Sequence, residues 1–435
     1  MEIKIREAFS VRKKIFAILS VLLLVVLTTV TGFSSKASAD NQIVLKFWKG
    51  GNDIVWHDYY LNLFKEYEAK HPNIKIEYAE APFGNGIDTK LNTAYASDTS
   101  PDIIHHALNS IAIRAEKGQY EPLDNYISHW KDKNDILPNI YEMGRYKKKL
   151  YGLGIYPTPA VFVYRKDFFK EAGLNPENPP TSWKELAVDA VKLTKRDGKI
   201  VTRAGLNMPI DEIKLLQPFG IQAGGNFVDK NGNPTFDDAG YVEALTYLTD
   251  LFKNKQVAIE QTKDRENQQS LFAVDKAAMS IVQPTWIAQL LKNDPSLKDK
   301  IGFINMKRKK AAVWSGCELL FISSESKHKK ESWDLIQFIM AKQEMWNRYK
   351  TTKCPVVRKS LQDQYANDDP FINKQLLNAI SVGQGAPKSM WSQLYVYKYL
   401  PQAQQEAFYG MKTPQQALKD NLALMKAEIK ASNMK

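Results

Sequence analysis

In this 435-residue chain, the residues best suited to recognising a ligand are tryptophans at positions that the sequence predicts to be loops. The four in such positions are Trp48, Trp286, Trp314 and Trp391. A flat aromatic ring covers the C–H face of a sugar ring, and the indole N–H can donate one hydrogen bond. The pattern favours carbohydrate recognition, although each ring could instead belong to a hydrophobic core.

Motifs for covalent or acid–base chemistry are missing from the sequence. It contains no G-x-S-x-G, H-E-x-x-H or C-x-x-C. Gly152-x-Gly154 lacks the third glycine and the following helix that a dinucleotide-binding loop needs. Aspartates and glutamates are plentiful enough for a glycosidase, but their spacing singles out no pair. We therefore expect a protein that is not an enzyme and that needs no cofactor.

Two sequence features resemble metal sites, and neither has the full pattern. His105 and His106 are neighbours on an expected strand, so their side chains point to opposite faces. The segment starting at Asp229 has Pro234 and Gly240 where a calcium loop needs glycine and glutamate. The sequence therefore predicts no metal site.

The two cysteines, Cys317 and Cys354, leave one question open. A pair in an exported chain can be oxidised to a disulfide. Spacing alone does not decide between a disulfide and two free thiols.

The first 39 residues have the layout of a secretory signal peptide. Basic residues precede the uncharged segment 15–30, and Ala37-Ser38-Ala39 then leads to Asp40. The apolar segment is shorter than the ~20 residues that span a bilayer comfortably. We predict an exported chain, with an uncleaved membrane anchor as the alternative.

Composition bounds the remaining possibilities. The chain has 60 Lys and Arg against 48 Asp and Glu, a formal charge of +12. These charges are interspersed, whereas a nucleic-acid-binding face usually concentrates basic residues, so no nucleic acid is expected. At ~100–200 residues per domain, the part after the leader predicts two domains.

The order of expected elements is that of an α/β fold. An apolar strand at 43–48 precedes a helix at 57–70, a strand at 74–78, a helix at 89–96 and a strand from 103. This alternation is typical of a parallel sheet covered on both faces. The alternation restarts with a strand at 160–164, and no linker separates the halves. We expect two lobes joined by short crossovers.

Several stretches, taken in order, resemble the extracellular solute-binding proteins of ABC sugar importers, the group that includes maltose-binding protein. They include Phe64-Lys65-Glu66-Tyr67, His71-Pro72-Asn73-Ile74, Ser100-Pro101-Asp102-Ile103, Tyr164-Arg165-Lys166-Asp167, Pro180-Thr181-Ser182-Trp183 and Trp314-Ser315-Gly316. The resemblance extends over essentially the whole chain after the leader.

The resemblance implies a two-lobed periplasmic-binding-protein-like α/β fold of class II type, with the ligand cleft between lobes joined by a three-crossing hinge. The crossings would lie near residues 155–158, 311–315 and 365–370. The N-terminal lobe would then comprise residues 40–157 with 312–366. The C-terminal lobe would comprise 158–311 with 367–435.

The implied function is capture of a sugar or oligosaccharide outside the cytoplasm and delivery to the permease of an ABC transporter. We expect a monomer whose partners are the carbohydrate and the permease subunits. One alternative is a non-sugar solute, such as a glycerol phosphodiester or a polyol. Another, of a different class, is a secreted glycan-active enzyme or adhesin.

The expected binding residues combine the resemblance with the rule that ligands lie beyond the carboxyl ends of strands in open α/β sheets. The family places a binding tryptophan where Trp286 stands, and Tyr397 corresponds roughly to an aromatic position of the maltose-binding relatives. The predicted set is Trp48, Asn109, Tyr156, Thr158, Trp286, Trp314, Gly316, Trp391 and Tyr397.

One residue departs from the family pattern. Gram-positive members usually carry a lipid-modified cysteine at the end of the signal, and Phe33 stands in that place. Phenylalanine cannot be acylated there, so a lipoprotein anchor is not expected. The protein would be extracellular, attached to the cell surface or periplasmic.

Overall fold

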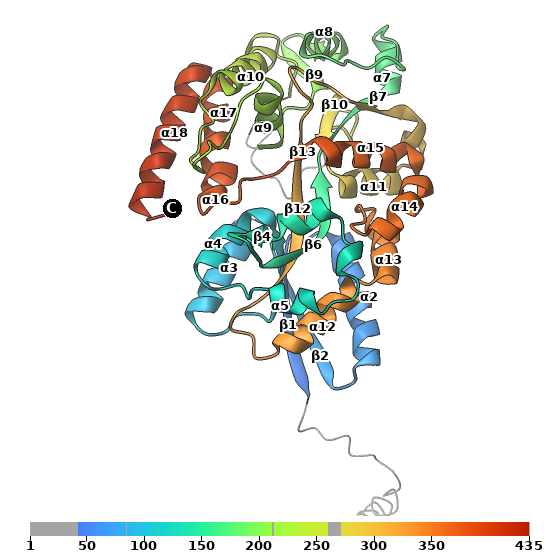
Figure 1. Cartoon of the computed structure of the whole chain (residues 1–435). Coiled ribbons are helices and arrows are strands. Elements are labelled where there is room, and N and C mark those ends of the chain that lie inside the picture. The colour runs from blue at the N-terminus through green and yellow to red at the C-terminus, as the bar shows by residue number, and fades with distance from the viewer. Residues whose placement is uncertain (1–41, 84, 211–212, 260–270, 435) are drawn as a thin grey trace, which may run out of the picture. The chain divides into compact units, whose positions relative to one another are not determined.

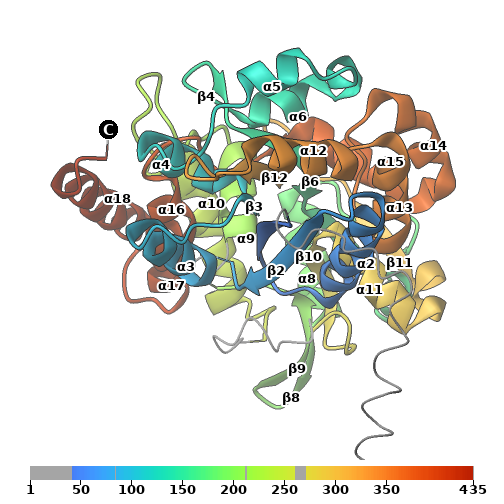
Figure 2. The ribbon, with the colours of Figure 1, turned by 90° about the horizontal axis from the view of Figure 1, so that it is seen from below.

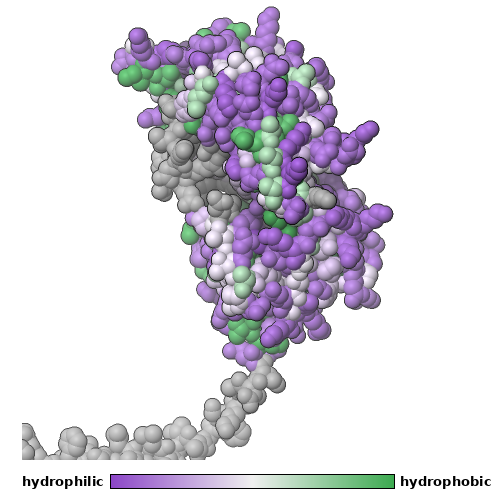
Figure 3. Space-filling model, turned by 90° about the vertical axis from the view of Figure 1, so that its left-hand side faces the viewer, coloured by the Kyte–Doolittle hydropathy of each residue, from purple (hydrophilic) through white to green (hydrophobic). Residues whose placement is uncertain are grey.

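The computed structural model describes residues 42–83, 85–210, 213–259 and 271–434. The predicted signal peptide, residues 1–39, lies outside the described residues, as does Phe33. No helix in the described part of the chain is long and apolar enough to cross a membrane. On the face drawn in Figure 3 hydrophilic residues predominate, and hydrophobic ones form small separate spots.

The first sheet has the order β13-β12-β3-β1-β2, and β6 pairs with β12 at the side of this path (Figure 1). Its strands are β1 (Ile43–Gly50), β2 (Ile74–Ala81), β3 (Ile103–Ala107), β6 (Gly152–Pro159), β12 (Val313–Ile322) and β13 (Gly383–Gln384). The pair β1 and β3 is parallel, as expected. β12 is antiparallel to both β3 and β6, so this sheet is mixed rather than wholly parallel.

The second sheet has the order β11-β7-β10-β9-β8. Its strands are β7 (Val161–Arg165), β8 (Lys195–Asp197), β9 (Ile200–Leu206), β10 (Ala277–Val282) and β11 (Ile301–Ile304). β10 is parallel to β9 and antiparallel to β7. A separate hairpin consists of β4 (Arg145–Tyr146) and β5 (Lys149–Leu150).

Helices cover both faces of the first sheet. Phe47 of β1 packs against Tyr60 and Phe64 of α2 (Ile54–Lys70), with ring centroids 4.9 and 5.0 Å away. Trp48, the next residue, points to the opposite face, where Lys90 of α3 (Asn85–Ala96) lies over its ring. Figure 2 shows α2 and α3 on either side of β2. The other helices of this half are α4 (Ile111–Glu116), α5 (Asp124–Ser128), α6 (Pro138–Met143), α12 (Lys329–Ile339), α13 (Lys342–Thr352) and α14 (Gln362–Asp368).

The second sheet also has a hydrophobic cluster on each face. Phe162, Leu206 and Phe219 belong to one cluster, and Val161 and Ile301 belong to the other. The first face is covered by α8 (Trp183–Leu193), α9 (Ile213–Gln222), α10 (Ala239–Thr249), α17 (Leu400–Phe408) and α18 (Pro414–Ala431). The second face is covered by α11 (Pro284–Asn293) and α15 (Pro370–Val382). Beside these lie α7 (Lys166–Glu171) and α16 (Ser392–Leu394).

Two segments of chain run directly between strands of the two sheets. The first is Ala160, because β6 ends at Pro159 and β7 begins at Val161. The second is 305–312, between β11 and β12. The chain also passes from α14 to α15 at Asp369, and from α15 back to β13 of the first sheet. Because β12 enters the first sheet from the second, it runs against β3, which explains the mixed strand directions.

Candidate ligand-binding site

The carboxyl ends of β1 and β3 meet at one edge of the first sheet, because these strands are parallel. Asn109 lies just beyond β3, in the short helix η2 (Leu108–Ser110). The residue is only 6% exposed, and its Oδ1 accepts no hydrogen bond from any described residue. Burying a polar atom without a partner costs about 1–3 kcal/mol. A ligand hydroxyl donating to this oxygen would remove that cost.

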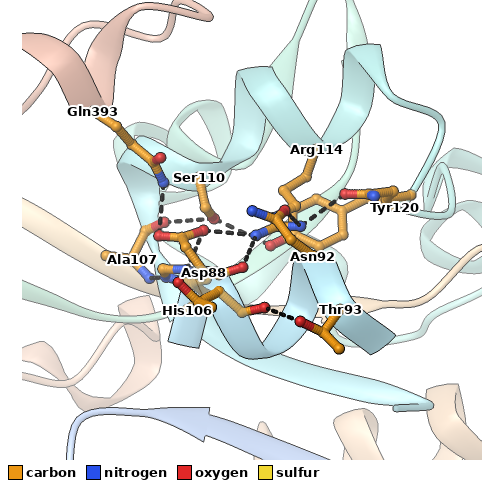
Figure 4. Close-up of polar contacts among 11 residues, drawn as sticks. Asp88, Asn92, Thr93, His106, Ala107, Ser110, Arg114, Tyr120 and Gln393 are labelled. Atoms are coloured by element: carbon orange, nitrogen blue, oxygen red, sulfur yellow. Dashed lines mark hydrogen bonds and ion pairs between the residues drawn. The ribbon is translucent and has the colours of Figure 1, made fainter. Parts of the chain in front are cut away.

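A carboxylate is fixed beside this edge by three donors (Figure 4). Asp88 of α3 accepts hydrogen bonds from Arg114 Nη2 at 2.7 Å and from Gln393 Nε2 at 2.8 Å. His106 Nε2 lies 3.4 Å from its Oδ1. The backbone N–H of Ala107 donates to His106 Nδ1 at 2.7 Å, so Nε2 is the ring nitrogen that faces Asp88.

The electrostatics of this network keep Asp88 ionised. Burial raises the pKa of Asp88, but His106 and Arg114 outweigh burial and hold the pKa well below its usual value. A permanent carboxylate at this place is an acceptor for hydroxyl groups. Gln393 comes from α16, which packs against η2, so Asn109 and Asp88 face the same helix. Four residues after Gln393, the side chain of Tyr397 is 40% exposed.

Three predicted site residues lie together where β6 pairs with β12. Gly316 pairs with Thr158 in the strand register. A Cβ on Gly316 would lie 2.9 Å from Thr158 Oγ1 and 3.8 Å from the ring of Trp314. The absence of a side chain at Gly316 therefore allows Thr158 and Trp314 to approach. Trp314 also lines a cavity of about 440 Å³.

Two other predicted residues have packing roles in the structure. Tyr156 stacks on Trp56 with ring centroids 4.7 Å apart and is 7% exposed. Trp391 is 4% exposed and donates its indole N–H to Gly232 O at 3.2 Å. Both rings therefore have packing partners within the protein.

The remaining two tryptophans are partly buried. Trp48 was expected to end its strand, but β1 continues to Gly50. The Lys90 ammonium lies 4.2 Å from the ring centroid of Trp48, so one face of the ring is covered. Trp286 lies in the first turn of α11 and packs against the cluster that contains Val161 and Ile301.

Both cysteines are buried free thiols, so the disulfide that the sequence left open is not formed. Cys317 lies on β12, and Cys354 follows α13. Burial raises the pKa of Cys354 to about 12 and raises that of Cys317 well above its usual value. Both thiols are therefore protonated near neutral pH.

A buried polar group that was not predicted from the sequence surrounds Glu318 of β12. Glu318 Oε2 lies 3.7 Å from His105 Nε2, and Lys49 Nζ donates to Gly51 O at 2.7 Å. Burial raises the pKa of Glu318 to about 8, opposed by Lys49. A single glutamate inside the apolar run Cys317–Ile322 was the available signal, since a lone charge in a buried strand usually has a partner. His105 and His106 do point to opposite faces, toward Glu318 and Asp88 respectively.

Comparison with known families gives one match that covers most of the chain. Residues 55–346 match the family model described as bacterial extracellular solute-binding protein. This range includes β2, β3, both hinge-side strands β6 and β12, and the whole second sheet.

Curated relatives and solved structures agree with this match. The arabinooligosaccharide-binding protein of Bacillus subtilis is 26% identical over 296 residues, which cover 66% of each protein. The maltotriose-binding protein of Pyrococcus abyssi is 24% identical over 348 residues, 74% of this chain and 70% of that protein. An ABC transporter solute-binding protein of Thermotoga lettingae, solved with bound α-D-tagatose, superposes with a TM-score of 0.78 at 24% identity, covering 88% of this chain and 98% of that one. The chain shares with it a two-lobed α/β fold.

Proposed function

Because the chain belongs to the family of bacterial extracellular solute-binding proteins, we propose that it captures a sugar or oligosaccharide and delivers it to the permease of an ABC transporter. The protein binds its ligand without transforming it, and it acts as a monomer. Residues 1–39 direct export. Since Phe33 cannot carry a lipid, the mature protein is periplasmic, released or held by an uncleaved leader.

The observation that carries this proposal is the unpartnered Oδ1 of Asn109. Sugars offer several hydroxyl donors. Asn109, just beyond β3, supplies this amide oxygen, and α3 supplies the ionised Asp88. Tyr397 follows Gln393 by four residues, in the π-helix η7 (Tyr395–Tyr399), and is 40% exposed. Fixed acceptors beside an aromatic surface match the two faces of a sugar ring.

The lobes of the proposed protein are residues 40–157 with 312–366 and residues 158–311 with 367–435. The ligand lies between them, with Asn109, Thr158 and Gly316 on or near the first sheet and Trp286 beyond β10 of the second. The proposed set is completed by Trp48, Tyr156, Trp314, Trp391 and Tyr397. A ligand that touches both lobes favours the closed form, because it then has more contacts in that form.

A ligand screen tests this function. Purified mature protein is titrated calorimetrically with arabino-, malto- and manno-oligosaccharides, monosaccharides, polyols and glycerophosphodiesters. We expect at least one saccharide to bind with micromolar affinity or better, without turnover of the saccharide. Binding of polyols or phosphodiesters alone would contradict the sugar assignment, and release of shortened glycans would indicate an enzyme.

The screen is repeated with a variant of the key residue. Asn109→Ala removes the unpartnered acceptor, and we expect the affinity for the saccharide to fall about tenfold, since 1.4 kcal/mol corresponds to that factor. Asn178→Ala, at an exposed loop position, is the matched control and should leave affinity unchanged. Equal affinity of both variants would remove Asn109 from the site.

A further inference from the structure

The cavity beside Trp314 is lined by both segments that run between the sheets and by α15. Ala160 belongs to the first segment, Ala312 to the second, and α15 supplies Ala379 and Val382. We call this space of about 440 Å³ the hinge cavity. Its size is within the range of about 300–1,000 Å³ typical of small-molecule sites.

The walls of the hinge cavity are mostly apolar and partly aromatic. Phe219 comes from α9, Phe303 from β11 and Trp314 from β12. Of the residues predicted for sugar binding, Trp314 alone lines this cavity. The hinge cavity is therefore largely separate from the site around Asn109 and Asp88. An apolar ring or branched chain fits such walls.

The polar residues of the cavity wall differ from those of a sugar site. Two lysines, Lys214 and Lys307, line it, and none of the described residues in its wall is an aspartate or a glutamate. Lys307 forms no ion pair with a described residue. The amide oxygens of Gln375 and Asn305 already accept hydrogen bonds, from Asn305 and Asn378, each at 3.1 Å. Few hydrogen-bond acceptors therefore remain for the hydroxyl groups of a sugar, whereas the lysine ammonium groups favour an anionic ligand.

We propose that the hinge cavity binds an amphipathic monocarboxylate, aromatic or branched aliphatic, with its carboxylate at Lys307, and that occupancy changes the affinity for sugar. The apolar part of the ligand lies against Phe219, Phe303 and Trp314. Coupling follows because a ligand shifts a conformational equilibrium by its differential affinity for the two states. Rotation of the lobes moves the walls of the cavity relative to one another, so the open and closed forms bind the carboxylate unequally. This coupling rests on the proposed sugar-binding function, whereas the binding itself does not.

Direct titration of sugar-free protein tests the binding. The probes are 3-phenylpropionate, its neutral analogue 3-phenylpropionamide, and acetate, which has the charge without the ring. We expect 3-phenylpropionate to bind and the amide to bind at least about threefold more weakly, a difference that calorimetry resolves. No binding of 3-phenylpropionate at millimolar concentration, or equal binding of acid and amide, would overturn the proposal.

Two variants locate the bound probe. Val382→Phe fills the cavity, and we expect it to weaken binding of 3-phenylpropionate about tenfold or more. Lys307→Met, at an exposed position of the rim, should weaken binding of the acid and leave that of the amide unchanged. The controls are Val188→Phe on the exposed face of α8 and Lys310→Met in the same loop as Lys307. If the controls weaken binding as much as Lys307→Met does, the probe is not in the hinge cavity.

The coupling is measured separately. The Kd for the best saccharide is determined with and without saturating 3-phenylpropionate, and we expect a change of at least about twofold that Val382→Phe abolishes. An unchanged Kd overturns the coupling. If no saccharide binds at all, the sugar-free titration still decides whether the hinge cavity is a ligand site, so the two failures are distinguishable.

Discussion

Gln393 donates a hydrogen bond to Asp88 at 2.8 Å across 305 positions of sequence. The donor is on α16, and the acceptor is on α3 beside the first sheet. Asp88 is held in place by Arg114 and His106 from its own half of the molecule. Gln393 is thus the one partner of Asp88 in Figure 4 that comes from the C-terminal part of the chain.

We expect Gln393→Ala to weaken binding of the saccharide. The lost bond joins α16 to the edge where the ligand lies, and a charge-assisted hydrogen bond contributes about 1.5–3 kcal/mol. Calorimetry should show an affinity reduced about threefold to tenfold with an unchanged fold by circular dichroism. Gln402→Ala, whose amide bonds only within its own helix, is the control. If Gln393→Ala binds the saccharide as tightly as wild type does, the hydrogen bond between Gln393 and Asp88 does not contribute to ligand binding.

The secondary structure near this edge was largely predictable from the sequence, but the contact was not. Tyr60, Leu63, Phe64 and Tyr67 have helical spacing, and all four are buried in α2. The helix begins earlier than predicted, at Ile54, because the Asp53 side chain accepts from Val55 N and caps it. Gln393 and Asp88 have no local pattern that relates them, because their contact exists only once both halves have folded.

The aromatic residues show a second limit of sequence reasoning. Trp391, Tyr156 and Trp314 are all buried by tertiary packing, whereas Trp286, in similar polar or proline-containing surroundings, is only partly buried. Whether an aromatic ring in a loop contacts a ligand or joins a core depends on which side chains, distant in sequence, pack against it in the folded protein. For Tyr156 one such side chain is that of Trp56. One hundred positions separate the two rings, so no spacing pattern could identify the pair.

Asp88→Asn should lower the stability of the fold. Arg114 is 2% exposed and would lose its ionised partner, and breaking a buried ion pair costs about 3–5 kcal/mol. The pKa of Asp88 is lower in the folded state than in the unfolded state. Its stabilisation is therefore complete above the unfolded pKa, about 4, and is lost as pH falls toward the folded pKa.

The measurement is urea denaturation at pH 7 and between pH 4 and 3. The wild-type unfolding free energy should fall in the acidic interval more steeply than that of Asp88→Asn. Asp58→Asn, at an exposed position of α2, is the control and should retain the wild-type pH dependence. Parallel curves for wild type and Asp88→Asn would contradict the assigned pKa direction.

Glu318→Gln should stabilise the protein in alkaline solution. Burial raises the pKa of Glu318 to about 8, so the folded state holds a proton that the unfolded state releases above about pH 4.5. The stability due to this group therefore decreases as pH rises toward 8. Melting temperatures of the variant and wild type should agree at pH 5 and diverge in favour of the variant at pH 9. A variant less stable at pH 9 would show that the ionised carboxylate stabilises the fold.

Thiol titration tests the state of the cysteines. Since Cys317 and Cys354 are free and buried, a thiol reagent should react with neither in the native protein and with both in denaturant. The raised pKa values add to this protection, because the thiolate is the reactive form. Protein exported to an oxidising compartment and purified without reductant should give the same result. Absence of reactive thiols in denaturant would show a disulfide.

Gly316→Ala should lower the free energy of unfolding and weaken sugar binding. A second substitution, Thr158→Ala, tests whether a steric clash is the cause. The added methyl would lie 2.9 Å from Thr158 Oγ1, closer than a carbon and an oxygen normally approach. Overpacking of this kind costs about 1–3 kcal/mol. Thr158→Ala removes the obstructing oxygen, so the double variant should recover part of the unfolding free energy lost in Gly316→Ala, a coupling that a double-mutant cycle measures. If the losses of unfolding free energy in Gly316→Ala and Thr158→Ala simply add in the double variant, the two side chains do not clash. The strain in Gly316→Ala would then lie in the backbone.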